Sequence, residues 1–192
     1  MAETDEALVA RTKSGDGSAF EVLVDRYMKK AYFIAYDIVG NQEDARDLSQ
    51  EAFVKAYESL ARFRGDSRFY TWFYRILVNC CFDFRKRRIR IDGMTVAPLT
   101  DPDTGREVDR PIAATGRDSN PLEALRQTEL GEKIREAVGA LTPQQRTAFV
   151  LKNDQGLQIK EIAKIMRVAE GTVKAHLHWA VKSLQEKLKT YR

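Results

Sequence analysis

The sequence has few of the residues that cross-link a chain or bind a metal. Its 192 residues contain two histidines and two cysteines, and the cysteines, Cys80 and Cys81, are neighbours. Adjacent cysteines cannot bridge distant parts of a chain, and a metal site needs more ligands than this pair supplies. We therefore expect two free thiols in a reducing compartment, and neither a metal nor another cofactor.

Long apolar runs are also missing. No segment reaches the roughly 18 consecutive apolar residues that a membrane-spanning helix needs. The first six residues contain Glu3, Asp5 and Glu6, which is not the pattern of a signal peptide. Since 43% of the residues are hydrophobic, a wholly disordered chain is excluded as well. The composition predicts a globular cytoplasmic protein with no direct membrane insertion.

Prolines are scarce outside one segment. Four of the five prolines lie between residues 98 and 121, and Gly93, Gly105 and Gly116 lie nearby. The residues among them follow no sustained hydrophobic period, which predicts a flexible linker over 91–119. A structureless loop of this length is uncommon inside a compact domain, so the pattern divides the chain into units 1–90 and 120–192.

The first unit has the hydrophobic periodicity of helices. Apolar residues recur at steps of three and four: Phe20, Leu23, Val24, Tyr27, Ala31, Ile34 and Ile38. Ser18 with Glu21 predicts a capping box at the start of this helix, and Gly40 predicts its end. Asn41 with Asp44 predicts the cap of a second helix that runs to about residue 60. A turn at 65–67 precedes a third helix over 67–88.

The second unit is also predicted to be helical. Asn120-Pro121 and Thr142-Pro143 each place a cap residue before a proline, and Gln145 completes a capping box with Thr142. We find no alternating strand pattern. The predicted fold is all-α, with two small helical domains joined by a flexible linker.

The charges are unevenly distributed. The net charge of +4 is made up of −5 in residues 1–60, +7 in 61–90, −3 in 91–120 and +5 in 121–192. Two basic blocks on either side of an acidic spacer suggest two contacts with a polyanion, and the acidic first segment suggests a different partner. Ordinary solvated surfaces would produce the same composition, so the charges alone leave both interpretations open.

Residues 158–186 have the pattern of a helix-turn-helix. A short amphipathic helix at 158–166 is followed by a tight connection and a second helix that opens at Gly171. Such a unit presents its second helix to the major groove of DNA. The stripe predicted to be buried consists of Val173, Leu177, Ala180, Leu184 and Leu188. The residues that point away from this stripe or flank it are Thr172, Lys174, Ala175, His176, His178, Trp179 and Lys182. A plain helical bundle would show the same stripe.

Residues 63–84 contain eight aromatic residues interleaved with arginines, and four basic residues follow at 85–88. Cations hold a phosphate backbone and aromatic faces accept unstacked bases, so the segment suits a single strand or a melting duplex. Helical spacing also assigns Phe69, Phe73 and Leu77 to a core, and we expect most of the aromatic residues to be packing residues. The candidates that remain for DNA are Phe63, Arg64, Trp72, Arg75, Asn79 and Lys86.

Three segments resemble bacterial sigma factors of the extracytoplasmic-function group. Residues 44–57, DARDLSQEAFVKAY, resemble the helix that binds core RNA polymerase. FRGDS at 63–67 and YTWFYRI at 70–76 resemble the promoter-melting segment, and GTVK at 171–174 resembles the recognition helix. The resemblance runs in order over nearly the whole chain except the linker. It implies a protein that directs promoter-specific transcription initiation and is not an enzyme.

The resemblance also implies residue roles. Asp47, Gln50 and Glu51 would dock on the clamp coiled coil of the largest polymerase subunit, and their spacing puts them on one helix face with Val54. The helix at 67–88 would hold the minus-ten element, with a flipped base near the loop at 63–70 and Asn79. The minus-thirty-five element would face Lys174, Ala175, His176, His178 and Trp179.

The family also implies partners. Besides core RNA polymerase, the chain would bind double-stranded and locally melted promoter DNA. The acidic linker would thread toward the active-site and RNA-exit path of the polymerase. An anti-sigma factor, soluble or membrane-anchored, is the expected regulator in a stress or envelope response.

The sequence departs from the family pattern in its recognition helix. Where the group often has several arginines, this chain has Lys174, His176 and Trp179, and Ala169 leaves the helix without a capping side chain. Promoter sequence therefore cannot be carried over from the family. Trp179 lies about 145° from the centre of the buried stripe. Packing on the preceding helices, an anti-sigma interface and a DNA contact all remain open for it.

Two other functions remain as alternatives. A repressor or activator that never binds polymerase would explain the helix-turn-helix, but not the acidic helix or the aromatic-basic helix. An enzyme acting on nucleic acid would need metal-binding carboxylates or an activated nucleophile. His176 and His178 lie on different sides of a helix, and no carboxylate motif accompanies them.

Overall fold

The computed structural model describes residues 3–91, 99–100, 107–108 and 129–189, and within them the fold is predominantly helical. The first half contains α1 (Asp5–Lys13), α2 (Gly17–Val39), α3 (Gln42–Ser59), a 3-10 turn at Leu60–Arg62 and α4 (Phe69–Ile91). The second half contains α6 (Glu129–Gly139), α7 (Pro143–Asn153), α8 (Ile159–Met166) and α9 (Glu170–Lys187). The predicted all-α fold is confirmed, and α4 begins and ends later than the expected 67–88.

The predicted linker lies outside the described residues except at a few positions. Ile91 ends α4, and two-residue strands β1 (Leu99–Thr100) and β2 (Glu107–Val108) pair in antiparallel register. No alternating strand pattern marks these four residues in the sequence. Two residues per strand are too few for an alternating pattern to be recognised in the sequence. The helix start expected at Asn120-Pro121 also lies outside the described residues.

Most of the predicted helix ends are confirmed. Gly40 ends α2 in the left-handed region with φ 76°, and the Asn41 side chain accepts from the Asp44 N–H. Thr142 and Gln145 form both hydrogen bonds of a capping box. The start of α2 is a correction. Its N-cap is Asp16 instead of the predicted Ser18. The Asp16 carboxylate accepts hydrogen bonds from both the N–H and the hydroxyl of Ser18, so the Ser18 hydroxyl is a donor to the cap residue.

Helix α1 was not predicted. Its side chains Leu8 and Val9 are buried, and the Asp5 carboxylate accepts hydrogen bonds from Arg26 and Tyr27 of α2. Two buried apolar residues give too weak a periodicity to be recognised, so tertiary contacts with α2 hold this helix in place.

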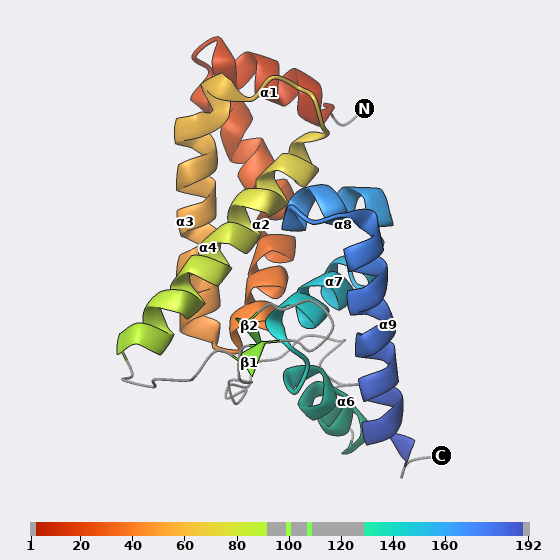
Figure 1. Ribbon diagram of the computed structural model, residues 1–192. Coiled ribbons are helices and arrows are strands. Elements are labelled where there is room, and N and C mark those ends of the chain that lie inside the picture. The colour runs from red at the N-terminus through yellow and green to blue at the C-terminus, as the bar shows by residue number, and fades with distance from the viewer. Residues whose placement is uncertain (1–2, 92–98, 101–106, 109–128, 190–192) are drawn as a thin grey trace.

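The two halves pack against each other. Figure 1 shows α2, α3 and α4 side by side, with α1 across one end and α6 to α9 on the other side of α2 and α4. Helix α8 contacts α4, and α7 contacts α2. Most of the buried apolar residues form one cluster that includes Leu23 and Phe73 of the first half and Leu151 and Ile162 of the second. The core is therefore continuous across the two halves.

Candidate polymerase and nucleic-acid interfaces

Helix α3 has one buried face and one exposed face. Ala45, Leu48, Ala52, Phe53 and Ala56 are buried, with the Phe53 ring stacked on Phe73 at 4.3 Å. Three of the predicted docking residues, Asp47, Gln50 and Val54, are exposed on the other face. A valine that is 58% exposed is only partly covered by this chain, and its apolar surface suits a protein contact.

The exposed face of α3 includes a residue that sequence reasoning missed. Tyr57 is 54% exposed and lies three residues after Val54. The steps of three and four residues that connect Asp47, Gln50 and Val54 on one helix face could have identified it. Tyr57 also contacts Phe20 edge to face at 5.0 Å, so its ring is oriented by the core while one side remains open.

The fourth predicted docking residue, Glu51, is half-buried and paired. Its carboxylate lies 2.7 Å from Lys55 Nζ, and the same ammonium lies 3.6 Å from Cys80 Sγ. The hydrogen bond to Glu51 raises the pKa of Lys55. Burial raises the pKa of both Cys80 and Cys81, so neither thiol is an activated nucleophile.

Helix α4 also divides into two faces. Phe69, Phe73, Tyr74 and Leu77 are buried, and the remaining aromatic residues of 63–84 pack partly against the core. The prediction that most of them are packing residues is confirmed. The candidates Trp72, Arg75, Asn79 and Lys86 fall within an arc of about 60° at 100° per residue. Lys86 is exposed and the other three are half-buried, so the structure brings these four together on the solvent side.

The loop before α4 brings two further candidates next to this face. The half-buried Phe63 ring lies 4.9 Å from the Trp72 ring, and Arg64 is exposed. Lys13 of α1 donates to the Phe63 carbonyl and lies 5.8 Å from its ring centroid. Phe63 and Trp72 thus form an aromatic pair at the edge of the outer face of α4.

The helix-turn-helix is formed by α8 and α9. Gln158 and Glu161 make a capping box at the start of α8, and Arg167 ends it in the left-handed region with φ 57°. Helix α9 starts at Glu170, and its N-cap Ala169 makes no side-chain hydrogen bond, as predicted. Val173 and Ala180 are fully buried, whereas Leu177, Leu184 and Leu188 of the predicted stripe are half-buried.

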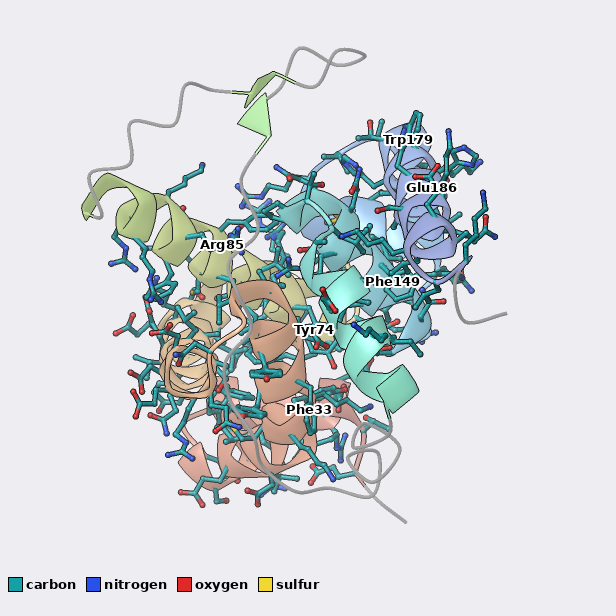
Figure 2. All side chains as sticks on the ribbon, turned by 90° about the horizontal axis from the view of Figure 1, so that it is seen from below. Phe33, Tyr74, Arg85, Phe149, Trp179 and Glu186 are labelled. Atoms are coloured by element: carbon teal, nitrogen blue, oxygen red, sulfur yellow. The ribbon has the colours of Figure 1, made fainter. Side chains whose placement is uncertain are left out.

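The predicted minus-thirty-five residues lie along the outer side of α9. Lys174, Ala175, His178, Trp179 and Lys182 are exposed, and Thr172 and His176 are half-buried. Trp179 is 43% exposed and lies at the outer edge of the molecule in Figure 2. Its ring contacts the His178 ring at 5.7 Å, and Lys182 Nζ lies 5.0 Å from its centroid. Both ring contacts lie within α9, and the exposed part of the indole is open to solvent.

The second half covers only one side of α4. The Tyr70 hydroxyl of α4 donates to the Glu161 carboxylate of α8. Tyr70 and Tyr74 lie about 100° or more around the helix from Arg75. The packing of α8 therefore leaves the predicted minus-ten face of α4 open.

Two searches cover only the residues that the structure describes. No group of three potential metal ligands occurs among them. No described helix is both long and apolar enough to span a membrane.

Comparisons with known proteins agree on one family. Residues 23–91 match Sigma-70 region 2, and residues 131–184 match Sigma-70, region 4. The ECF RNA polymerase sigma-E factor of Escherichia coli K12 is 35% identical over 96% of this chain and 94% of its own length. The RNA polymerase sigma-H factor of Pseudomonas aeruginosa is 32% identical over 97% of this chain and 94% of its own.

A solved structure shares the fold. The sigma factor RpoE from Bartonella quintana, in complex with the anti-sigma factor NepR, aligns with a TM-score of 0.65 over 90% of this chain and 98% of that one, at 24% identity. Together, the family matches and the full-length relatives show that this chain belongs to the sigma-70 family of RNA polymerase sigma factors, in its extracytoplasmic-function group.

Proposed function

We propose that this sigma factor docks on core RNA polymerase through α3, holds the melted minus-ten element on the outer face of α4, and contacts the minus-thirty-five element through α9. The observation that carries the proposal is the exposure of Val54 and Tyr57 beside Asp47 and Gln50. Such a mixed apolar and polar surface suits a protein partner, whereas a repressor that never meets polymerase would have no use for it.

The DNA contacts follow from the chemistry of the other two faces. Arg75 and Lys86 supply cations for phosphates, and the Phe63–Trp72 pair offers aromatic surface to an unstacked base. On α9, Lys174 and Lys182 suit phosphates, and Ala175 suits a thymine methyl group. We assign polymerase docking and the minus-ten element to a domain at 1–90, the minus-thirty-five element to a domain at 120–192, and the connection to a linker at 91–119.

We further propose that the chain acts in the bacterial cytoplasm under the control of an anti-sigma factor. The shared fold with RpoE, which was solved with the anti-sigma factor NepR, supports this regulation. The chain would contribute recognition and melting, whereas nucleotide addition belongs to core polymerase.

The test is a titration of the purified chain against core RNA polymerase, followed by promoter-dependent transcription in vitro. Gln50→Ala with Glu51→Ala, and separately Val54→Asp, should weaken polymerase binding while the helical content stays constant. Lys29→Gln, at an exposed position on α2, is the control and should bind like wild type. Unchanged affinity in both α3 variants would remove the docking assignment. Binding of promoter DNA without any polymerase binding would favour the repressor or activator instead.

A further inference from the structure

A cavity of about 620 Å³ lies where α8 packs against α2 and α4. This volume falls within the range of roughly 300–1,000 Å³ that is usual for small-molecule sites. One wall comes from the first half of the chain, with Lys30, Arg68 and Tyr74, and the other from the second half, with Lys160 and Lys164. None of the residues named for polymerase or promoter contacts lines this cavity, although Ser67, Arg68 and Tyr70 belong to the 63–70 loop next to which a flipped base is expected.

The lining carries an excess of positive charge. Four cations, Lys30, Arg68, Lys160 and Lys164, face a single carboxylate, that of Glu161. Among the described residues, no ion pair or side-chain hydrogen bond involves the side chains of these four cations, and all four are solvent-exposed. A concave surface lined by one sign of charge concentrates counter-ions more strongly than scattered surface lysines do.

The carboxylate in the cavity lining, that of Glu161, already accepts two hydrogen bonds. Glu161 accepts from the Tyr70 hydroxyl and, at 3.0 Å, from the Gln158 N–H. Burial alone would raise the pKa of Glu161. The two hydrogen bonds and the nearby charges of Arg68 and Lys164 outweigh this effect, so the pKa is lowered. Glu161 therefore stays ionised, but it offsets only part of the charge of four cations contributed by both halves.

The rest of the lining offers hydrogen-bond donors. Ser67 and Thr71 supply hydroxyl groups, and Gln155 and Gln158 supply amides. Both α4 and α8 begin at the cavity, so the partial positive charge of each helix start adds to that of the cations. The ligand class that matches several cations and several neutral donors in this volume is an anion with more than one phosphate group.

We propose that this cavity binds a free oligophosphate anion that bridges the two halves of the chain. Contacts of one ligand with Lys30 and Arg68 on one wall and with Lys160 and Lys164 on the other stabilise the packing of α8 on α4. Without the anion, the four cations repel one another across the interface. Tyr70 and Tyr74 lie about 100° or more around α4 from Arg75 on the outer face, whereas Thr71 lies only about 40° from it, so the cavity borders the face where DNA is expected and a bound DNA strand is the rival that the test must exclude.

The test is calorimetric titration of the full chain with sodium tripolyphosphate at low ionic strength, in the absence of polymerase and promoter. The expected result is saturable binding of one anion per chain. Lys30→Gln, and separately Lys160→Gln with Lys164→Gln, should each weaken it about tenfold or more, as the loss of a charge-assisted contact predicts. The matched control is Lys29→Gln, the neighbouring exposed lysine outside the cavity lining, which should bind like wild type.

Two further measurements separate the proposal from its rivals. Tripolyphosphate should slow hydrogen exchange at the amides of α8, whereas sulfate at the same ionic strength should not. A single-stranded oligonucleotide should fail to displace tripolyphosphate. Absence of saturable binding, an equal loss in Lys29→Gln, or displacement by the oligonucleotide would each overturn the proposal. Because no readout requires sigma activity, the outcome is independent of the proposed function.

Discussion

Arg85 of α4 and Arg146 of α7 donate to the same backbone carbonyl, that of Ile38, at N–O distances of 3.0 and 3.5 Å. Both side chains are buried, and Figure 2 shows Arg85 directed into the molecule from α4. Ile38 lies in the last turn of α2, where carbonyl groups carry partial negative charge. Arg146 also donates to the carbonyls of Val138, Gly139 and Leu141, so one guanidinium connects helix ends in both halves.

Replacing Arg146 should destabilise the chain strongly. Burial, together with the charge of Arg85, lowers the pKa of Arg146 to about 10, so it remains a buried cation at neutral pH. Arg146→Met would leave several buried carbonyls without donors, which should lower the free energy of unfolding by about 2–4 kcal/mol. Urea denaturation measures this loss. Arg87→Met, at an exposed position of α4, should change stability by less than about 0.5 kcal/mol. Equal effects of the two substitutions would contradict the bridging role of Arg146.

Alkaline pH should destabilise the first half. Burial raises the pKa of Tyr27, Tyr70 and Tyr74, and hydrogen bonds to Asp5 and Glu161 raise it further in the first two. Tyrosines of the unfolded chain ionise near pH 10, whereas these three stay protonated when folded. Their contribution to stability is therefore complete below pH 10 and is lost as the pH rises above it.

The measurement pairs phenolate absorbance with the free energy of unfolding between pH 8 and about 12. In wild type, part of the absorbance change should coincide with unfolding. Tyr74→Phe removes one of the three ionising groups and should flatten the decline in stability. Titration of all tyrosines near pH 10 in a chain that stays folded would show that burial does not hold these groups protonated.

The sequence predicted those parts of the fold that depend on local chemistry. Gly40, Asn41 and Thr142 act through residues one to four positions away, so their roles could be inferred without a structure. The start of α2 was misplaced because two residues only two positions apart, Asp16 and Ser18, could each act as the cap, and the Asp16 carboxylate accepts hydrogen bonds from Ser18. A charged acceptor at a helix start is the stronger of the two.

In the candidate site, too, local spacing predicted some features, and contacts between distant residues determine the others. Spacing alone brought Arg75, Asn79 and Lys86 to one face, since a helix fixes the angle between its residues. The packing of the two halves rests on contacts between residues far apart in the sequence, such as Tyr70 with Glu161 and Arg146 with Ile38. No local pattern encodes such pairs, so neither the continuous core nor the cavity between the halves could be predicted.

Asn79 should act after the promoter opens. It is half-buried on the outer face of α4 and offers amide groups that can bond the edge of an unpaired base. Asn79→Ala should reduce open-complex formation more than closed-complex binding, because a flipped base is available only in opened DNA. Permanganate footprinting reports opening, and a mobility shift at low temperature reports the closed complex. Lys29→Gln, at an exposed position on α2 away from this face, serves as the control. Equal losses in the two assays would assign Asn79 to duplex binding instead.

Trp179 and Lys174 should affect promoter binding in different ways. Lys174 is a fully charged group on α9, so Lys174→Ala should reduce the slope of log affinity against log salt by about 1. Trp179 can stack, cover a thymine methyl group or donate one hydrogen bond, but it carries no charge. Trp179→Ala should therefore weaken binding to minus-thirty-five DNA with little change in slope. The Lys182 ammonium lies next to the Trp179 ring, and Trp179→Ala removes this contact. A small change in the salt slope of this variant is therefore expected from Lys182. Lys187→Ala, at the far end of α9, controls for the general effect of removing a charge. If Trp179→Ala instead lowered the melting temperature and left DNA affinity intact, the ring would stabilise the packing of α9. The part of the ring that is exposed, 43%, would then not be a DNA contact.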